Sequence, residues 1–373
     1  MGREFAGAVA RWCHLTDIDV KPELVAVCDV NVPETTVRWF TGHFPTVSQV
    51  TGDYREVLRN PDVDAVFCAV PHNLHEELYC ASIEAGKHLM GEKPFGMDKK
   101  ANSAILETIR KHPGVFVRST SEFPFYPAVQ RMCDMIEEEA FGTIIEVEAG
   151  FLHSGDLDPL KPVNWKRIAA YNGEYGCMGD LGMHVCHVPF RAGWIPRTVR
   201  ALLSNIVPER PDGKGGVTAC DTWDNATLLC ETADTRTGTL FPMTLKMFRI
   251  APGEKNTWYL SVLGTKASAR FSTKNPSLLQ VLEYTGGEQA WRHIDMGNEM
   301  AFKTITGSIF SPGFSDLILQ MWAAFLYELE HGRPLKRFAG CVTPDETALS
   351  HDLFTAALTS GKHGETVPVP SPS

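Results

Sequence analysis

The sequence has 373 residues, of which 43% are apolar and 21% charged, a composition typical of a folded globular protein. Its length predicts two domains, each large enough to bury its own core. Asp and Glu total 45 against 35 for Lys and Arg, and this acidic balance predicts that nucleic acid is not a partner. No apolar run reaches the ~18 residues of a membrane-spanning helix, so we expect no membrane partner either.

The first third of the chain predicts strands that alternate with helices. Its strands are short apolar runs, as expected of strands covered on both faces, and two of its helices begin with a polar residue followed three positions later by a glutamate. The expected strands are residues 23–29, 63–70, 88–92 and 115–118; the expected helices start at Asp53, at Asn73 (ending at Gly86) and at Asp98 (ending at Lys111). This alternation predicts right-handed βαβ crossovers and a doubly wound parallel sheet.

The pattern changes after about residue 121, where longer strands alternate polar and apolar residues and predict a mostly antiparallel sheet with one open face. The expected elements are helices at 126–139 and 314–330, strands at 143–151, 226–231 and 239–248, a final helix at 343–361, and a frayed tail at 367–373. The fold class is therefore α/β, with a Rossmann dinucleotide-binding domain at 1–121 and a substrate-binding and oligomerisation α/β domain at 122–373.

An acidic residue, Asp29, ends the first predicted strand. A dinucleotide-binding fold holds the adenosine ribose hydroxyls with such a residue, although a carboxylate that caps the next turn is the alternative. The glycine-rich fingerprint expected about 20 residues earlier is reduced to Gly2, followed by a helical pattern at 5–10. We therefore expect the first strand and two glycines to lie upstream of Met1; otherwise the chain begins here and its cofactor pocket is damaged.

Two further patterns carry candidate chemistry. Lys93, within Glu92-Lys93-Pro94, follows a strand whose carboxyl end would line the ligand crevice, where a desolvated lysine exchanges protons with a substrate hydroxyl; a solvated surface lysine is the alternative. Asp180 and His184 are four residues apart, so on a helix the carboxylate would orient the imidazole as a general base. A structural histidine or a metal site are the alternatives, and because no other ligand follows at suitable spacing we expect no metal.

Together these residues resemble the Gfo/Idh/MocA family of nicotinamide-dependent sugar and cyclitol oxidoreductases. The resemblance spans nearly the whole chain and is carried by Asp29, the turn at 70–75 (Val-Pro-His-Asn-Leu-His), Glu92-Lys93-Pro94, Phe125-Tyr126-Pro127, Asn164-Trp165 and the stretch 176–184. Three positions depart from the family pattern: Glu174-Tyr175 replaces two glycines, His187 replaces a common Asp, and Glu122 stands where relatives often have Asn or Arg.

The resemblance implies a set of site residues. The catalytic group would be Lys93, Asp180 and His184. The cofactor would contact Gly2, Arg3, Asp29, Val70, Pro71, Asn73, His75, Glu92, Lys93, Pro94 and Trp165, and the substrate Lys93, Glu122, Tyr126, Trp165, Arg167, Asp180 and His184.

The sequence thus predicts a hydride transfer between the hydroxyl of a sugar, cyclitol or sugar derivative and NAD, with NADP as the less favoured cofactor because Asp29 would repel its 2′-phosphate. Two rivals stay open: a glycoside hydrolase that oxidises its substrate transiently with a bound NAD, using Glu122 or Tyr175 as proton donor, and a non-catalytic sugar or nucleotide sensor. We also expect a homo-oligomer formed through the open sheet. The ten scattered cysteines are expected to be reduced, which predicts a cytoplasmic protein.

Overall fold

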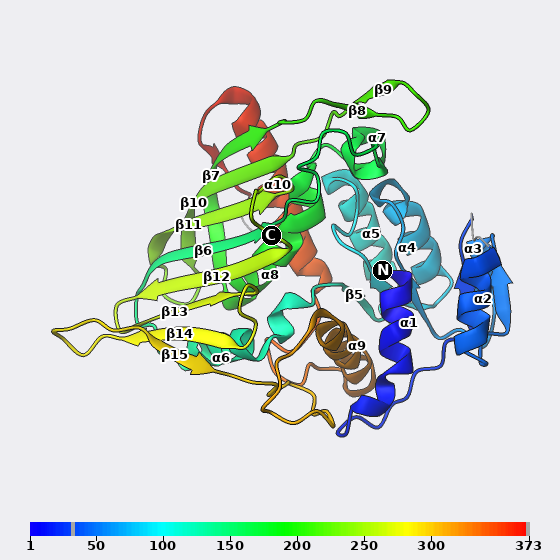
Figure 1. The fold of residues 1–373 in the computed structure, drawn as a ribbon, viewed down its shortest axis with the longest axis horizontal. Helices are drawn as coiled ribbons and strands as arrows, with labels where there is room; N and C mark the ends of the chain where they lie inside the picture. Colours follow the sequence, from blue (N-terminus) through cyan, green and yellow to red (C-terminus); the bar gives the residue numbers. More distant parts are fainter. Residues whose placement is uncertain (31–33, 371–373) are drawn as a thin grey trace.

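The computed structural model describes residues 1–30 and 34–370. It has two halves, a Rossmann-type half drawn on the right of Figure 1 and a half built on one large sheet on the left. The ten cysteines are free thiols. Among the described residues, no helix is both long and apolar enough to cross a membrane.

The Rossmann-type half follows the predicted alternation of strands and helices. Its strands are β1 (Ala26–Cys28), β2 (Gln49–Thr51), β3 (Ala65–Cys68), β4 (His88–Gly91) and β5 (Val117–Ser119), and its helices are α1 (Gly2–Ala10), α2 (Glu34–His43), α3 (Tyr54–Arg59), α4 (His75–Glu84) and α5 (Lys99–Lys111). The strand pairs are parallel, as predicted. Short 3₁₀ turns, η1 (Trp12–His14) and η2 (His72–Leu74), precede β1 and α4.

The parallel strands form two separate sheets in the described part of the chain, β1–β2 and β3–β4–β5. Each strand of the two-stranded β1–β2 sheet has one open edge, and the thiol of Cys28 in β1 is exposed. The prediction that this strand is buried on both faces was therefore wrong, whereas Cys68 in β3 is buried as expected. The expected helix start at Asn73 was also wrong, since α4 begins after η2 without a side-chain cap.

The second half is built on a nine-stranded sheet with the order β15-β14-β13-β12-β6-β11-β10-β7-β16. Every pair in this sheet is antiparallel except β6 with β11, which confirms the predicted mostly antiparallel sheet. The strands are β6 (Ile144–Leu152), β7 (Trp194–Ser204), β10 (Asn225–Asp234), β11 (Leu240–Phe248), β12 (Thr257–Gly264), β13 (Ala267–Ser272), β14 (Leu278–Glu283), β15 (Arg292–Asp295) and β16 (Val367–Pro368); β8 (Glu209–Pro211) and β9 (Val217–Ala219) form a separate hairpin.

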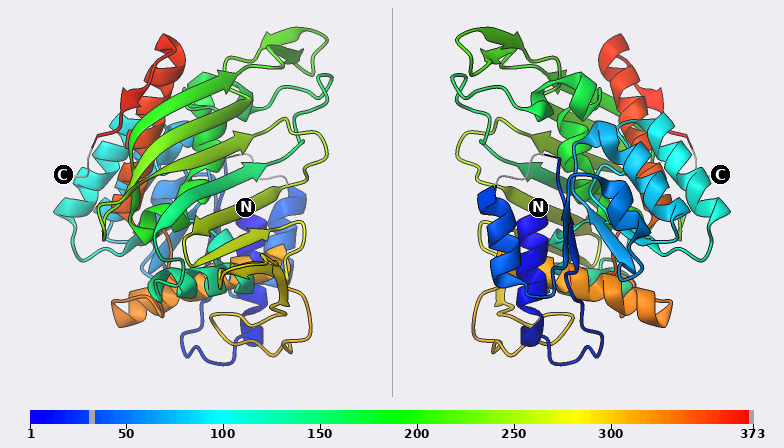
Figure 2. Two further views of the ribbon diagram at one scale, coloured as in Figure 1. Left: turned by 90° about the vertical axis from the view of Figure 1, so that its left-hand side faces the viewer. Right: turned by 90° about the vertical axis from the view of Figure 1, so that its right-hand side faces the viewer.

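Helices cover one face of this sheet and leave the other open, as Figure 2 (left) shows. They are α6 (Pro127–Glu137), α8 (Cys177–Ala192) and α10 (Pro344–His363). Helix α9 (Phe314–His331) packs on α1 and the 3₁₀ turn η3 (Phe123–Phe125), and α7 (Ala169–Asn172) packs on η2 and the 3₁₀ turn η4 (Trp165–Arg167). The tail expected to fray forms β16 on β7, so that prediction was wrong for Val367 and Pro368; residues 371–373 lie outside the described residues.

Helix α8 occupies the centre of the molecule and is buried along nearly all of its length. It is buried because the sheet lies on one side and α10 on the other. A Cβ added to Gly182 would lie 2.4 Å from Cζ of Phe354 in α10 and 3.2 Å from Sδ of Met247 in β11. Glycine at this position therefore lets α8 approach both layers.

The two C-terminal helices return to the first half of the chain. The Trp322 ring of α9 packs on Phe5 of α1 and Phe67 of β3, with ring centroids 4.2 and 5.2 Å apart. Helix α10 packs against both α5 and α8. The predicted boundary near residue 121 thus separates the chain in sequence, while α9 and α10 pack on both halves.

Candidate active site

The candidate site joins the end of strand β4 to helix α8. Lys93, two residues beyond β4, donates hydrogen bonds to Oδ1 of Asp180 at 2.8 Å and to the main-chain carbonyl oxygen of the same residue at 2.7 Å. Its side chain is only 15% exposed. Burial by itself would lower the pKa of Lys93, but the carboxylates of Asp180 and Glu92 outweigh burial and raise it. Lys93 is therefore a fixed, buried cation.

Asp180 holds two more cations that the sequence analysis missed. Lys166 donates to Oδ1 and Oδ2 at 2.9 and 3.1 Å, and Nε of Arg249 lies 3.4 Å from Oδ2. Burial alone would raise the pKa of Asp180, yet Lys166, Lys93 and Arg249 together hold it well below its usual range. The carboxylate is thus permanently charged and fully engaged.

Sequence signals existed for both missed residues. Lys166 follows Asn164-Trp165, which the resemblance already contained, and Oδ1 of Asn164 caps the turn by accepting from the Lys166 main-chain N–H at 3.0 Å. Arg249 directly follows the alternating strand β11, at the end where a charged residue either meets solvent or enters a site. It is fully buried, and it also donates to the Lys166 carbonyl oxygen at 2.9 Å.

His184 lies one turn after Asp180 on α8, as the four-residue spacing predicts. Its ring packs edge-on against Phe123 and Phe151, and its Nδ1 lies 3.7 Å from Oε2 of Glu122. Burial, reinforced by the charge of Lys93, lowers the pKa of His184 well below its ordinary value. The expected orienting role of Asp180 is not what the structure shows, because Asp180 binds Lys93 and Lys166 while Glu122 faces the imidazole.

Buried side chains fix the backbone around Lys93. Tyr79 donates to the carbonyl oxygen of Glu92 at 2.8 Å, and Asn102 donates to that of Phe95 at 2.9 Å. On the other side of the loop, Nε2 of His351 lies 2.7 Å from the carbonyl oxygen of Pro94. The lysine is therefore held at a set position by partners on α4, α5 and α10.

Two family models match the chain. Residues 1–119 match the model of the Gfo/Idh/MocA oxidoreductase family described as an NAD-binding Rossmann fold, and residues 129–270 match the model of the Gfo/Idh/MocA C-terminal domain. The two models together cover most of the sequence. The chain belongs to the Gfo/Idh/MocA family.

Relatives within this family include a levoglucosan dehydrogenase from Pseudarthrobacter phenanthrenivorans, 31% identical over 172 residues, or 46% of this chain and 44% of the relative. The match thus spans less than half of that relative's length. A levoglucosan dehydrogenase structure in complex with NADH and L-sorbose superimposes with a TM-score of 0.87 at 22% identity, covering 100% of this chain and 96% of the other. An inositol dehydrogenase homolog from Azotobacter vinelandii, complexed with NAD⁺, gives 0.74 at 18% identity over 95% and 99% of the two chains.

The NAD-binding fold of the family is consistent with what lies at the carboxyl ends of the parallel strands. Asp29 is exposed directly after β1, and the turn that contains Val70 and Pro71 follows β3. Gly2 opens α1 without a side-chain cap, and the main-chain N–H groups in the first turn of a helix can bind a phosphate. These groups fit a dinucleotide.

The remaining cofactor-side residues of the family pattern lie in the same region. His75 is buried, with Nε2 3.2 Å from the Val70 carbonyl oxygen and Nδ1 accepting from the Gly96 main-chain N–H at 3.3 Å. Asn73 is exposed on η2. Arg3 donates to the hydroxyl of Thr36 on α2 at 2.8 Å. These contacts give His75 a positioning role for the two turns and leave Asn73 accessible.

Trp165 lies beside the charged cluster. Its ring packs edge-on against His72 with centroids 4.9 Å apart, and the Lys166 ammonium lies 5.7 Å from its centroid. His72 Nδ1 is 3.0 Å from the carbonyl oxygen of Asn172, and burial lowers the pKa of His72 to about 3. The indole is half-buried, which leaves part of it available to a ligand.

Three residues expected near the ligand or the reaction are engaged in buried contacts within the protein. Arg167 is fully buried and ion-paired with Asp224, so the structure does not bring it to the Lys93 cluster. Tyr126 is buried against Phe271, with ring centroids 5.2 Å apart. Tyr175, a candidate proton donor of the glycosidase alternative, shares a hydrogen bond of 2.7 Å with the hydroxyl of Thr355 on α10. Packing and buried polar contacts explain where these three side chains lie.

Proposed function

We propose that the protein is an NAD-dependent dehydrogenase that transfers a hydride between the hydroxyl-bearing carbon of a sugar, cyclitol or sugar derivative and the nicotinamide. The observation that carries this proposal is the Lys93–Asp180 pair beside His184, at the carboxyl end of a parallel strand in a Gfo/Idh/MocA chain. The sugar substrate is supported by the relatives, one of which is a levoglucosan dehydrogenase.

Lys93 stabilises negative charge on the reacting oxygen. An ammonium group has three N–H donors, and Asp180 accepts two of them, which among the described residues leaves one for a substrate oxygen. Because its pKa is raised, Lys93 stays protonated and acts as a hydrogen-bond donor rather than as a base. Its charge is worth most here, in a buried site, as the hydroxyl develops alkoxide character.

His184 accepts the hydroxyl proton. Because its pKa is lowered, the free imidazole is neutral near pH 7 and can accept a proton. The negative charge that develops on the substrate oxygen beside the ring offsets the cost that burial imposes on protonating it. The transfer of hydride to or from the substrate carbon is the chemistry that NAD supplies when bound. In the reverse direction His184 returns the proton to the carbonyl oxygen.

Other residues set specificity in this proposal. The carboxylate of Asp29 at the end of β1 favours NAD, because it would repel the 2′-phosphate of NADP. The half-buried Trp165, beside His72 and Lys166, would pack against the nicotinamide. Glu122 lies beside His184, and Lys166 shares the carboxylate of Asp180 with Lys93, so both are polar neighbours of the two proposed catalytic residues.

Calorimetric titration of NAD and NADP into the protein is the first test. We expect heat only with NAD, and then NADH production with a panel of sugars and cyclitols that begins with levoglucosan. Lys93→Met and His184→Asn variants should keep NAD affinity and lower turnover by about 10²–10⁴-fold, the usual share of general acid–base catalysis. Turnover by either variant at the wild-type rate would overturn the assigned roles.

The two rivals predict different results in the same experiment. A glycoside hydrolase that oxidises transiently would cleave a glycoside with no net NADH, and a sensor would bind sugar or nucleotide with no turnover at all. Net NADH formation in step with substrate loss therefore supports the dehydrogenase. Absence of dinucleotide binding and turnover would favour the sensor.

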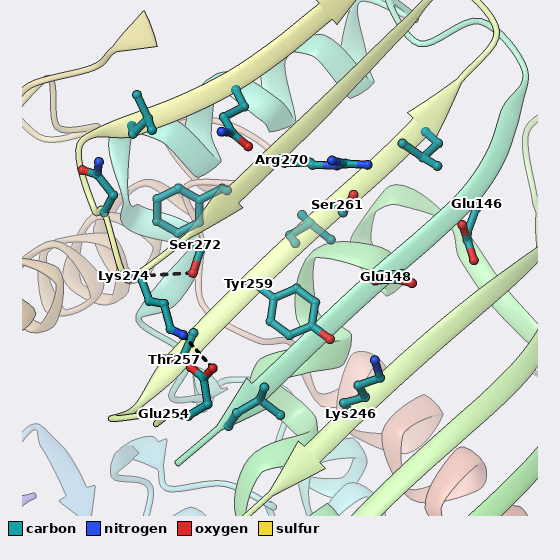
Figure 3. A pocket seen from close by; sticks show the side chains of 17 residues that line it. Glu146, Glu148, Lys246, Glu254, Thr257, Tyr259, Ser261, Arg270, Ser272 and Lys274 are labelled. Atoms are coloured by element: carbon teal, nitrogen blue, oxygen red, sulfur yellow. Dashed lines mark hydrogen bonds and ion pairs between the residues drawn. The ribbon is translucent and has the colours of Figure 1, made fainter. Parts of the chain in front are cut away.

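We also propose that the protein forms a homo-oligomer through the open face of the large sheet. One row of this face crosses paired strands and carries Arg200, Leu229, Thr244, Glu148, Ser261 and Arg270. Glu148, Ser261 and Arg270 of this row also line a hollow of ≈ 630 Å³. Figure 3 shows the ring of Tyr259 there, among Glu148, Lys246 and Arg270. Charges of both signs beside apolar groups suit a self-complementary surface.

Sedimentation velocity tests this surface. We expect a dimer or tetramer, and we expect Leu229→Asp to shift the protein toward the monomer, because this apolar side chain is 49% exposed within the row. Leu160→Asp is the matched control, since that leucine is 76% exposed on a loop outside the sheet. A monomeric wild-type protein would contradict the proposal.

A further inference from the structure

The imidazole of His184 has an unpaired side. Its Nδ1 is buried without a hydrogen-bond partner among the described residues, and the polar atom that faces it is Oε2 of Glu122, 3.7 Å away. Leaving a buried polar atom unpaired costs about 1–3 kcal/mol. Hydrogen bonds of catalytic groups are often long in ligand-free sites and tighten when substrate binds, so a small rotation of either side chain would pair the two groups.

Asp180 is not available for this purpose. Its two carboxylate oxygens already accept from Lys93 and Lys166, and Arg249 lies beside them. These three cations outnumber the single negative charge, so a shift of Asp180 toward His184 would leave at least one buried cation without its counter-ion, which is costly. Glu122 is therefore the carboxylate that His184 can use.

Glu122 is buried, and burial makes its carboxyl a weaker acid. Its side chain is 9% exposed, and burial raises its pKa to about 7, with the charge of Glu92 adding to the effect and that of Lys93 opposing it. The carboxyl is thus divided between its two protonation states near neutral pH, and a proton moves on or off it at little cost.

We propose that Glu122 is the positioning carboxylate of His184, which holds the proton of the imidazole on Nδ1 and accepts that proton when the other ring nitrogen takes one from the substrate. This inference rests on the proposed dehydrogenase function. The protons balance: the hydroxyl proton bonds to Nε2, the Nδ1–H bond breaks, and Glu122 ends as a carboxylic acid beside a neutral imidazole. His184 then never carries a full charge in its apolar surroundings of Phe123 and Phe151.

Several charged or titratable groups face this pair. Glu92 and Lys93 approach from the end of β4, Tyr126 from the start of α6, and Asp180 and His187 from α8, with Lys166 from η4. Lys93 is protonated and Asp180 ionised across the neutral range, and burial lowers the pKa of His187 to about 3 and raises that of Tyr126 to about 12. Although Asp180 raises the pKa of Lys166, burial and the charge of Lys93 lower it overall, so the assignment of an inflection near pH 7 to Glu122 depends on removing the Glu122 carboxyl.

Nitrogen-15 NMR of histidine-labelled protein tests the pairing without cofactor or substrate. With His184 identified by comparison with a His184→Gln variant, we expect a neutral ring with its proton on Nδ1 and a shift of Nδ1 that inflects near pH 7. Glu122→Gln should keep the ring neutral and remove the inflection. Glu107→Gln, which removes one carboxylate from the exposed face of α5, is the control and should titrate as the wild type does. A proton on Nε2, or an inflection that survives in Glu122→Gln, would overturn the proposal.

Kinetics supply the second measurement. We expect kcat for hydroxyl oxidation to rise with pH through about 7, since only the ionised carboxylate of Glu122 can take the proton. Glu122→Gln should lower kcat about 10²-fold with KM little changed and lose the rising limb, and Glu122→Asp should restore part of both. An unchanged kcat with a raised KM would make Glu122 a substrate ligand and overturn the proposal. If the wild type has no turnover, the dehydrogenase function fails, and the NMR result still decides the Glu122–His184 pairing.

Discussion

Nζ of Lys93 binds Asp180 twice, once at the side-chain Oδ1 and once at the main-chain carbonyl oxygen. The second bond is independent of the charge on the carboxylate and ties the lysine to the backbone of α8. Because Lys93 follows β4 of the Rossmann-type half and α8 underlies the large sheet, the same two bonds also connect the halves of the molecule. The same ion pair thus fixes the position of Lys93 and contributes to the contact between the two halves.

The charges around Asp180 predict that substitutions of Asp180 and of Lys93 lower the free energy of unfolding by different amounts. Asp180→Ala removes the shared counter-ion of three cations and should lower the free energy of unfolding by about 3–5 kcal/mol. Lys93→Met should cost less, about 1–3 kcal/mol, because Lys166 and Arg249 still neutralise the carboxylate. Urea unfolding followed by circular dichroism measures both values. A larger loss for Lys93→Met than for Asp180→Ala would contradict this account of the cluster.

Two glycines of α8 predict opposite responses to the same substitution. Gly182→Ala would place a methyl group 2.4 Å from Phe354, so we expect a loss of about 1–3 kcal/mol from overpacking. Gly179→Ala meets its nearest atom, Cβ of Tyr175, at 3.4 Å, which is ordinary contact, and should gain up to about 1 kcal/mol from higher helix propensity. Thermal unfolding of the two variants gives the comparison, and equal shifts in Tm would refute the packing argument.

A buried ion pair predicts loss of stability in acid. Arg191 binds both carboxylate oxygens of Glu346, at 2.7 and 2.6 Å. Burial alone would raise the pKa of Glu346, but Arg191 holds it at about 2, below the ordinary 4.5. A carboxyl whose pKa is lower in the folded than in the unfolded chain stabilises the folded state at pH values above its unfolded pKa. The contribution of Glu346 to the free energy of unfolding is therefore complete above about pH 4.5 and is lost as the pH falls toward 2.

Glu346→Gln isolates that charge, since glutamine can still complete the capping box with Thr343. We expect the variant to be less stable than the wild type by about 3–5 kcal/mol at pH 7 and the difference to shrink between pH 4.5 and 2. Glu283→Gln breaks an exposed pair with Arg292 and should cost no more than about 1 kcal/mol. A difference between Glu346→Gln and wild type that stays constant with pH would exclude the ion pair as its source.

The separation of β1–β2 from β3–β4–β5 predicts how cofactor affinity responds to added chain. Placing a strand and a Gly-x-Gly turn ahead of Gly2 would offer backbone partners to β1 and β3 and N–H groups to a pyrophosphate. We expect NAD to bind at least about tenfold more tightly than to the unextended protein, a difference of about 1.4 kcal/mol. The same extension with valines for both glycines is the control, and equal affinity of the two extensions would rule out the turn as the cause.

Local patterns in the sequence were sufficient to predict most elements of the fold. The capping box at Thr343 predicts the start of α10, and the alternating residues of β10 and β11 predict their antiparallel pairing. The errors arose where tertiary contacts decide the outcome. Val367 joins the sheet because the edge of β7 is open to it, and Cys28 is exposed because β1 has a partner strand on one side.

From the sequence, the residues that belong to the candidate site could be predicted better than the contacts between them. The spacing of Asp180 and His184 does place them on one buried helix, but spacing within a helix says nothing about the cations that arrive from elsewhere. Lys166 reaches Asp180 from η4, 14 residues earlier in the chain. Arg249 reaches it from the end of β11. Asp180 consequently pairs with lysines, and Glu122 is left to face His184.

The return of α9 and α10 onto the first half of the chain has a consequence for unfolding. Trp322 contacts Phe5 and Phe67, and Phe354 contacts the helix that carries Asp180, so the last sixty residues complete the cores of both halves. Neither half can lose its structure without exposing apolar surface that belongs to the other. Domains that are distinct in sequence should therefore melt as one cooperative unit, with coincident calorimetric and spectroscopic transitions.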